Sequence, residues 1–296
     1  MSTLALNEQL ARQLAHWRGW IGRTEQSTDL VTAAPLHALA ATLDRDEAEL
    51  LPGTDIPPLA HWLYFLPVAP AHEIGPDGHP QRGAFLPPVP LPRRMWAGGR
   101  LEFHHPLQVG DEITRRSRIA QVDAKEGRSG PLVFVTVRHE VFNARGLAIA
   151  EEHDIVYRDA PVLGAAASNP APAPQPAPPE ASFSREIVPN PVLLFRYSAL
   201  TFNGHRIHYD RSYVTKVEGY PGLVVHGPLI ATLLVDLLRR ERPLARLKRF
   251  AFTAVRPTFD IHRFHVCGSD DGSSTFHLWG RDHEGCLTMR AEARTE

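Results

Sequence analysis

A proline- and alanine-rich segment divides this chain into two parts. Residues Ala160 to Ala181 include the run Ala-Ala-Ala-Ser-Asn-Pro-Ala-Pro-Ala-Pro-Gln-Pro-Ala-Pro-Pro, which offers almost nothing to a hydrophobic core. Proline and alanine in this pattern form an extended, semi-rigid spacer. We therefore expect an N-terminal half over residues 1–159, a linker over residues 160–181 and a C-terminal half over residues 182–296, each half of an ordinary domain size.

The two halves show the same order of predicted elements. The first begins with a helix at Ala34–Leu43 and an apolar segment at Leu59–Leu66, and the second with a continuous apolar helix at Leu229–Leu238. Strands follow in both halves, and apolar and polar residues alternate clearly from Val133 to Val141, as in a sheet with one wet face. The predicted strands are Arg100–Phe103, Asp111–Val122, Leu132–Phe142, Leu147–Tyr157, Arg249–Val255, His262–Gly268, Ser274–Arg281 and Cys286–Glu292.

This repeated order predicts an α+β fold in which each antiparallel sheet wraps a helix. The helix of the second half is too apolar to lie on a surface. Pro221-Gly222 and His226-Gly227-Pro228 mark its entry, and Pro228 suits the first helical turn.

Composition excludes several functional classes. Lys and Arg total 32 against 33 for Asp and Glu, so no positive excess is available to hold a nucleic-acid backbone. Cys267 and Cys286, the only cysteines, form neither a disulfide framework nor a metal-ligand spacing. No stretch resembles a signal peptide or a membrane span. We expect a soluble, cytoplasmic protein that binds no nucleic acid and no membrane.

Two segments carry the chemistry, namely Tyr197–Asp210 and Gly222–Leu229. They place His205 and His208 just upstream of a helix whose first backbone N–H groups are unpaired and lie at the positive end of the helix dipole. We assign a binding site for an oxyanion to the backbone of Val225, His226 and Gly227, since Pro228 has no N–H to donate. Such an arrangement suits the addition or removal of water beside a thioester carbonyl.

The segment Tyr-Ser-Ala-Leu-Thr-Phe-Asn-Gly-His-Arg-Ile-His-Tyr-Asp, at Tyr197–Asp210, resembles the hydratase 2 motif of MaoC-like hotdog enzymes, written Gly-Asp-x-Asn-Pro-x-His. Trp20–Glu25 and Leu86–Gly99 are similar to the subgroup of type 2 3-hydroxyacyl-thioester dehydratases and itaconyl-CoA and mesaconyl-C4-CoA hydratases. The resemblance spans nearly the whole chain. It implies a double hotdog fold and a hydro-lyase acting on an α,β-unsaturated acyl-CoA, with itaconyl-CoA or mesaconyl-C4-CoA as the more specific expectation.

Carried over by position, the family's histidine falls on His208, its aspartate on Asn203, its asparagine on His205 and its proline on Arg206. Asn203 cannot accept a proton, which leaves His208 as the clear base. We hypothesise that His208 polarises the water, Asn203 orients it through its amide, and His205 or a relayed water returns the proton.

Structural roles compete with these assignments. His205 is as well explained by a role in the loop, and His226 is better explained by fixing the turn before the helix through the local backbone. We expect no metal, because no third ligand follows the His205-x-x-His208 pair on the same element. We also expect no redox cofactor, because water addition moves no electrons.

Arg93, Arg94 and Arg196 flank these motifs and are surface residues by default. Their alternative role is to bind the phosphates of CoA or a free carboxylate on a dicarboxylic acyl group. The segment with Trp62, Tyr64 and Phe65 corresponds in order to the helix of the second half and reads as core.

The first half shows no equivalent of Asn203–His208. We therefore expect it to lack a catalytic centre, to widen the acyl tunnel and to complete the sheet.

A hotdog thioesterase and a non-catalytic acyl-thioester binding protein remain the alternative functions. A homodimer is expected by analogy alone. The acyl group, its stereochemistry and the choice between CoA and a carrier protein do not follow from the sequence.

Overall fold

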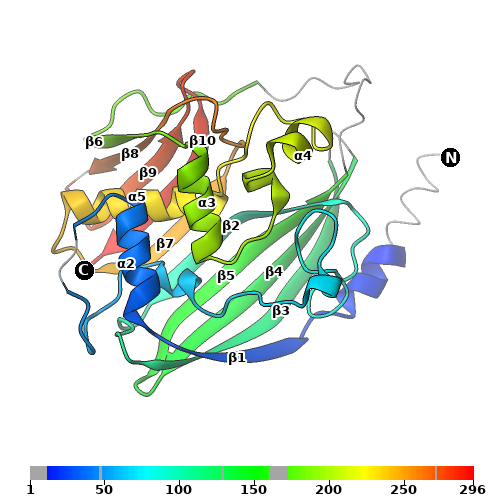
Figure 1. Cartoon of the computed structure of the whole chain (residues 1–296), viewed down its shortest axis with the longest axis horizontal. Coiled ribbons are helices and arrows are strands. Elements are labelled where there is room, and N and C mark those ends of the chain that lie inside the picture. Colours follow the sequence, from blue (N-terminus) through cyan, green and yellow to red (C-terminus); the bar gives the residue numbers. More distant parts are fainter. Residues whose placement is uncertain (1–11, 47–48, 128–129, 160–172, 271) are drawn as a thin grey trace.

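The protein is described by a computed structural model covering residues 12–46, 49–127, 130–159, 173–270 and 272–296. Its framework is one antiparallel sheet of ten strands, in the order β1-β3-β4-β5-β2-β7-β10-β9-β8-β6 (Figure 1). The strands of the first half are β1 (Thr24–Leu30), β2 (Arg93–Phe103), β3 (Glu112–Gly127), β4 (Gly130–Asn143) and β5 (Gly146–Arg158). Those of the second half are β6 (Phe183–Ile187), β7 (Leu247–Ala254), β8 (Phe264–Asp270), β9 (Thr275–Arg281) and β10 (Leu287–Thr295).

The two halves share this sheet, because β2 pairs with β7. The register runs from Gly98 opposite Thr253 to Glu102 opposite Arg249. A Cβ on Gly98 would lie 2.6 Å from the carbonyl oxygen of Phe252, so the strands meet closely where residue 98 has no side chain. The predicted two sheets are therefore one continuous surface.

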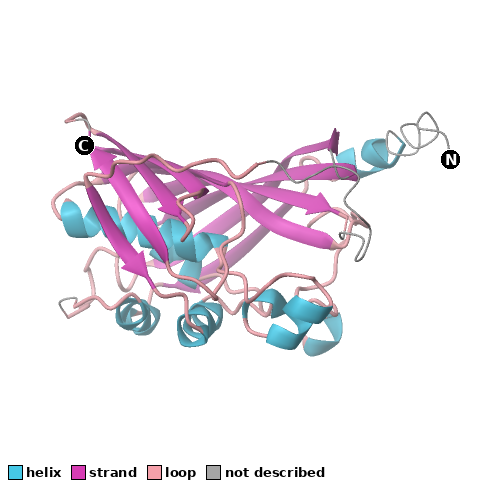
Figure 2. Cartoon of the chain, turned by 90° about the horizontal axis from the view of Figure 1, so that it is seen from above, coloured by secondary structure: helices cyan, strands magenta, loops and turns pink. Residues whose placement is uncertain are grey.

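Helices lie mostly to one side of this sheet (Figure 2). The labelled helices are α2 (Ala33–Thr42), α3 (Pro191–Leu200), α4 (Arg211–Lys216) and α5 (Gly227–Glu241), with short 3-10 turns η1 (Ala60–Leu63), η2 (Ala71–Glu73) and η3 (Arg206–His208). Residues 12–18 are helical as well. None of the helices in the described ranges is long and apolar enough to cross a membrane.

The central helix α5 is buried, as its sequence predicts. Residues from Leu229 to Leu238 are all buried, and they pack against strands β8, β9 and β10. Asp236 is the charged exception, and its carboxylate is bound by three arginines at 2.7–3.1 Å, so the buried charge is compensated. Those arginines are Arg45, Arg185 and Arg240.

Most predicted elements are present, and six of the eight predicted strands are longer than expected, whereas the one predicted at Ser274–Arg281 is a residue shorter. The segment Leu59–Leu66 forms only the single turn η1, because Leu59 and Phe65 adopt positive φ angles that interrupt a helix. Ala160–Pro172 of the predicted linker lies outside the described residues. The rest of the linker packs on the sheet: Ala177 is buried, and its backbone N–H donates to the Gly285 carbonyl at 3.0 Å.

Candidate active site

His208 is the buried imidazole at the end of η3. Its Nδ1 lies 2.7 Å from the backbone carbonyl oxygen of Val224. A carbonyl can only accept, so Nδ1 carries the hydrogen and Nε2 of the neutral ring keeps its lone pair. Burial lowers the pKa of His208 to about 4, although the bond to Val224 acts in the opposite direction. His208 is therefore neutral near pH 7 and has the protonation state of a base.

His226 lies directly before α5 and stacks on His208, with ring centroids 3.7 Å apart. Its Nε2 is hydrogen-bonded to the Ser198 hydroxyl of α3 at 2.8 Å. Sequence reasoning predicted a bond to the local backbone. The structure instead joins His226 to a side chain on another helix, while its buried Nδ1 has no partner among the described residues.

The entry to α5 offers fewer amide donors than the sequence predicted. The N–H of Val225 already donates to the carbonyl of Thr258 at 2.8 Å, so the assignment of Val225 as an oxyanion donor is wrong. The N–H groups of His226 and Gly227 have no hydrogen-bond partner in the described part of the chain. Both lie at the positive end of a buried helix, where they can stabilise an enolate oxygen.

Asn203 holds the motif loop in shape. Its side-chain oxygen accepts a hydrogen bond from the backbone N–H of His205 at 3.0 Å. Its Nδ2 group and the second lone pair of Oδ1 remain for the predicted role of orienting water. Neither takes a proton, so the site still lacks the acid–base group of the motif's aspartate.

His205 lies between His208 and a histidine of the first half. Its ring is perpendicular to that of His208 at 5.4 Å and tilted against that of His79 at 4.0 Å. Burial, followed by the charges of His79 and His208, lowers the pKa of His205 to about 2. The structure thus gathers four imidazoles in a row, in the order His79, His205, His208 and His226.

Sequence reasoning missed Asp77 and His79. They lie in the segment Gly75-Pro-Asp-Gly-His-Pro80, whose glycines and prolines indicate only a turn. Asp77 binds His79 through Oδ2 and Nδ1, 3.1 Å apart. The one local signal was a carboxylate two residues before a histidine, which is too common to indicate a site.

A group of three possible metal donors does exist, but it includes His205 without His208. One donor atom each from Asp77, His79 and His205 lie within 4.8 Å of one another. Reasoning along a single element could not find this group, since Asp77 and His79 come from the other half of the chain. That the protein needs no metal stays a prediction.

The three predicted anion-binding arginines separate in the structure. Burial is the main cause that lowers the pKa values of His79 and His205, and the positive charge of Arg94 lowers both further. Arg93 instead forms an ion pair with Glu218 at 2.8 Å and stacks on Tyr220. Arg196 is exposed on α3 and reaches the Ala41 carbonyl of α2 at 3.5 Å. Of the three, Arg94 alone acts through its charge on the clustered histidines.

The first half has a buried polar centre of its own. Glu151 accepts hydrogen bonds from His61 at 2.9 Å and from the Trp62 indole at 2.8 Å, and it also contacts His153. Burial alone would raise the pKa of Glu151, but His153 and His61 hold it well below its usual range. Trp96 packs on His153 at 3.9 Å, and its carbonyl oxygen is the nearest atom to a Cβ built on Gly227, at 3.7 Å. This centre therefore adjoins the entry to α5.

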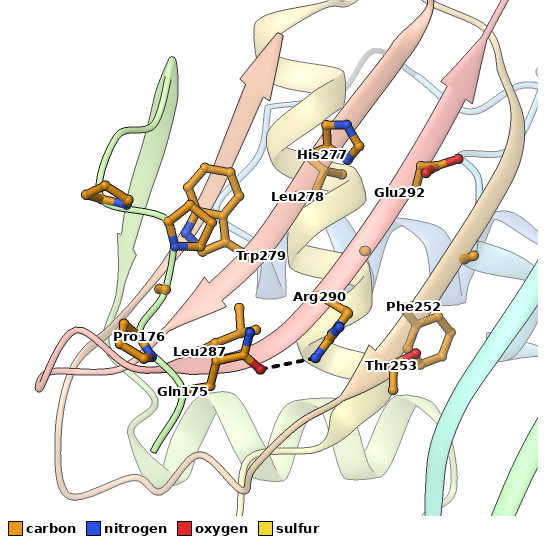
Figure 3. A pocket seen from close by; sticks show the side chains of 15 residues that line it. Gln175, Pro176, Phe252, Thr253, His277, Leu278, Trp279, Leu287, Arg290 and Glu292 are labelled. Carbon is orange, nitrogen blue, oxygen red and sulfur yellow. Dashed lines mark hydrogen bonds between the residues drawn. The ribbon is translucent and has the colours of Figure 1, made fainter. Parts of the chain in front are cut away.

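A separate hollow of about 700 Å³ lies on the strands β7, β9 and β10 (Figure 3). Gln175 of the linker closes one side and binds Arg290 at 3.2 Å. Trp279 lines it and belongs to a small apolar cluster distinct from the core around α5. None of the four clustered histidines lines this hollow, so the chemistry is assigned to the histidine cluster.

Fold and site together define a class of protein: a double hotdog with a MaoC-like histidine motif at the entry of its central helix. A MaoC-like dehydratase from Phytophthora capsici has the same fold, with a TM-score of 0.68, 14% identity, and coverage of 93% of this chain and 95% of that chain. A Mycobacterium tuberculosis protein described as having a double hotdog fold matches with a TM-score of 0.56 and 14% identity. The match covers 93% of this chain and 96% of that chain.

The family model of hydroxyacyl-thioester dehydratase type 2 matches residues 59–260. A mesaconyl-C(4)-CoA hydratase from Chloroflexus aurantiacus is 49% identical over 263 residues, which is 87% of this chain and 90% of the relative. The chain belongs to the hydroxyacyl-thioester dehydratase type 2 family. It is a hydro-lyase that adds or removes water at acyl thioesters, which confirms the expected fold, family and reaction type.

Proposed function

We propose that this enzyme hydrates mesaconyl-C4-CoA, an unsaturated acyl thioester with a free carboxylate. The observation that carries the proposal is the 49% identity to the Chloroflexus hydratase over 87% of the chain. A match over 87% of the chain spans both halves.

The hydrogen bond from Nδ1 of His208 to the Val224 carbonyl supports the proposed reaction, because it leaves the lone pair on Nε2. In that reaction Nε2 takes a proton from water while the water oxygen bonds to the β carbon of the acyl group. Negative charge then moves to the thioester oxygen, and the N–H groups of His226 and Gly227 are the donors we assign to that oxygen. Protonation of the α carbon completes the addition.

Arg94 supports a substrate with a second negative charge. It is the one arginine of the three whose charge reaches the histidine cluster. A guanidinium can bind a carboxylate through two parallel hydrogen bonds. A crotonyl group has no carboxylate and cannot form this pair.

The proposal is tested by mixing the purified protein with mesaconyl-C4-CoA, itaconyl-CoA and crotonyl-CoA. Loss of the conjugated enoyl-thioester absorbance should be fastest for mesaconyl-C4-CoA, and mass spectrometry should show that the product has gained one water. A kcat/KM for crotonyl-CoA equal to or above that for mesaconyl-C4-CoA would contradict the substrate assignment. Release of free CoA without gain of water would indicate a thioesterase.

The same proposal includes three expectations from the sequence. No redox cofactor is required, since hydration transfers no electrons. A homodimer is expected, and light scattering of the purified protein tests it. A cytoplasmic location is expected as well, and cell fractionation tests it.

A further inference from the structure

A loop of the first half is docked onto the motif loop of the second. The backbone N–H of Arg206 donates to the Asp77 carbonyl at 2.9 Å, and its guanidinium donates to the Pro76 carbonyl at 3.0 Å. Gly78 has a φ of +90°, and a Cβ built on it would lie 1.9 Å from the carbonyl oxygen of Gly204. The contact therefore requires glycine at position 78 and fixes the Asp77–His79 segment against the motif.

Asp77 holds His79 at two points, its backbone and its imidazole. Its Oδ1 accepts the backbone N–H of His79 at 3.0 Å, and its Oδ2 faces the ring Nδ1 at 3.1 Å. An ionised carboxylate only accepts hydrogen bonds, so Nδ1 carries a hydrogen and Nε2 is the position where the ring gains or loses a proton. A carboxylate behind an imidazole also stabilises the imidazolium form.

Hydration of an enoyl thioester needs two proton transfers at two different atoms. A base must take a proton from the water that attacks the β carbon, and a donor must give a proton to the α carbon. His208 can do the first. Asn203, at the position of the motif's aspartate, cannot do the second.

We propose that Asp77 and His79, from the first half, are the second acid–base group of this hydratase and replace the carboxylate missing at Asn203. The inference rests on the proposed hydratase function and goes beyond the motif. It also revises the expectation that the first half only shapes the acyl tunnel, since that half contributes a catalytic residue, His79, and its positioning residue, Asp77.

The proton balance of the step is complete. Nε2 of His208 takes a proton from water as the oxygen–β-carbon bond forms and the carbon–carbon double bond opens. The His79 imidazolium gives its Nε2 proton to the α carbon and becomes neutral. The proton on His208 then returns to His79, and the His205 ring between them, 4.0 Å from His79 and 5.4 Å from His208, lies on the direct route.

The surroundings of His79 shift its pKa in opposite directions. Burial lowers the pKa of His79, while Asp77 acts to raise it. The titratable and charged groups that face it from other segments are His205, whose ring lies 4.0 Å away, Arg94 on β2 and Arg82. Both arginines lower the pKa of His79. Loss of the Asp77 charge should therefore make the imidazolium form rarer.

The test compares His79→Gln, Asp77→Asn and the double variant His79→Gln/Asn203→Asp with wild type. The substrate is the enoyl-CoA that wild type hydrates fastest among mesaconyl-C4-CoA, itaconyl-CoA and crotonyl-CoA. If the wild-type enzyme prefers crotonyl-CoA, the proposed substrate is wrong, but the variants can still be compared on crotonyl-CoA. The acid–base inference is therefore tested separately from the substrate. The matched control is His72→Gln, the same change in the same region on a side chain that is 81% exposed.

We expect His79→Gln to lower kcat by about 100-fold or more, the usual contribution of a general acid or base. Asp77→Asn should lower kcat less and move the high-pH limb of the kcat profile to lower pH. Asn203→Asp should recover at least about tenfold of the activity lost in His79→Gln, because it restores the motif's carboxylate. His72→Gln should match wild type.

Several outcomes would overturn the inference. One is a His79→Gln enzyme with kcat within about threefold of wild type. Another is an unshifted pH profile in a folded Asp77→Asn enzyme, which would indicate a structural role. A third is loss of wild-type activity on treatment with EDTA and its return with added Zn²⁺, which would make Asp77, His79 and His205 a metal site. Circular dichroism of each variant establishes that it is folded.

Discussion

The imidazoles of His208 and His226 are stacked at 3.7 Å, and each is held by a hydrogen bond to a different element. His208 donates to the Val224 carbonyl, and His226 is bound by Ser198 of α3. Two rings at this separation cannot both be protonated without strong repulsion. The pair thus favours the neutral form of His208 that a base requires.

Replacement of His208 should remove most of the hydratase activity. His208→Gln should lower kcat for hydration by about 100-fold or more, since Nε2 of the ring is lost as a base. Steady-state kinetics on mesaconyl-C4-CoA measure the effect. His265→Gln, a change in a partly exposed histidine on β8, is the control and should keep wild-type kcat. A His208→Gln enzyme of near wild-type activity would remove His208 from the mechanism.

Gly78 should be needed for both stability and activity. Gly78→Ala should cost more stability than the roughly 1–2 kcal/mol of a left-handed alanine, because its Cβ would meet the Gly204 carbonyl. Displacement of the loop should also lower kcat by roughly 100-fold. Gly53→Ala is the matched control, since Gly53 has a φ of +85° and no atom within 4 Å of a built Cβ. Equal stability and equal activity of the two variants, measured by urea denaturation and kinetics, would show that the loops are not tightly docked.

Arg94 and Arg93 should behave differently when each is replaced by alanine. Arg94→Ala should raise KM for mesaconyl-C4-CoA by about tenfold and leave KM for crotonyl-CoA nearly unchanged, because only the former has a free carboxylate. Arg93→Ala should instead lower stability by up to about 3 kcal/mol, since it leaves Glu218 largely buried without its ion pair. An equal rise of KM for both substrates in Arg94→Ala would contradict recognition of the carboxylate.

Stability should fall in acid because the clustered histidines are buried as neutral rings. The pKa of His208 is about 4 in the folded protein and near its usual 6.5 when unfolded. Between these values the unfolded chain binds more protons, so the free energy of unfolding decreases as the pH falls from 6.5 towards 4. His205, with a pKa of about 2, acts in the same direction.

Chemical denaturation at a series of pH values measures this slope. His208→Gln should reduce it by up to about 1.4 kcal/mol per pH unit in that window, the limit for a single group. An unchanged slope in the variant would show that His208 is not buried as a neutral ring.

Much of the fold could be predicted from local pattern. Alternation along Val133–Val141 indicates β4, and the apolar run Leu229–Leu238 indicates the buried helix α5, because each periodicity reflects which faces are covered. The pairing of β2 with β7 could not be predicted. It joins strands of two halves through backbone hydrogen bonds, which leave little trace in side-chain pattern.

The site divides in the same way. His208 and Gly227 follow from a motif that is contiguous in sequence. Val225 was assigned wrongly because its N–H is taken by Thr258, a residue from a different loop. Arg196 was chosen for its nearness to the motif along the chain, yet its helix turns it towards α2. Asp77 and His79 escaped notice because only tertiary packing brings them to the motif.

The docking of Gly78 against Gly204 means that the C-terminal half of this enzyme should not work apart from the N-terminal half. A fragment that encodes only residues 182–296 carries the whole hydratase motif, yet it lacks the backbone against which Arg206 and Gly204 are held and the strand that β7 pairs with. Exchange of halves between relatives should therefore fail unless both loops are transplanted together. The two halves should therefore evolve together: a mutation in one of the two docked loops is expected to be tolerated only with a compensating mutation in the other.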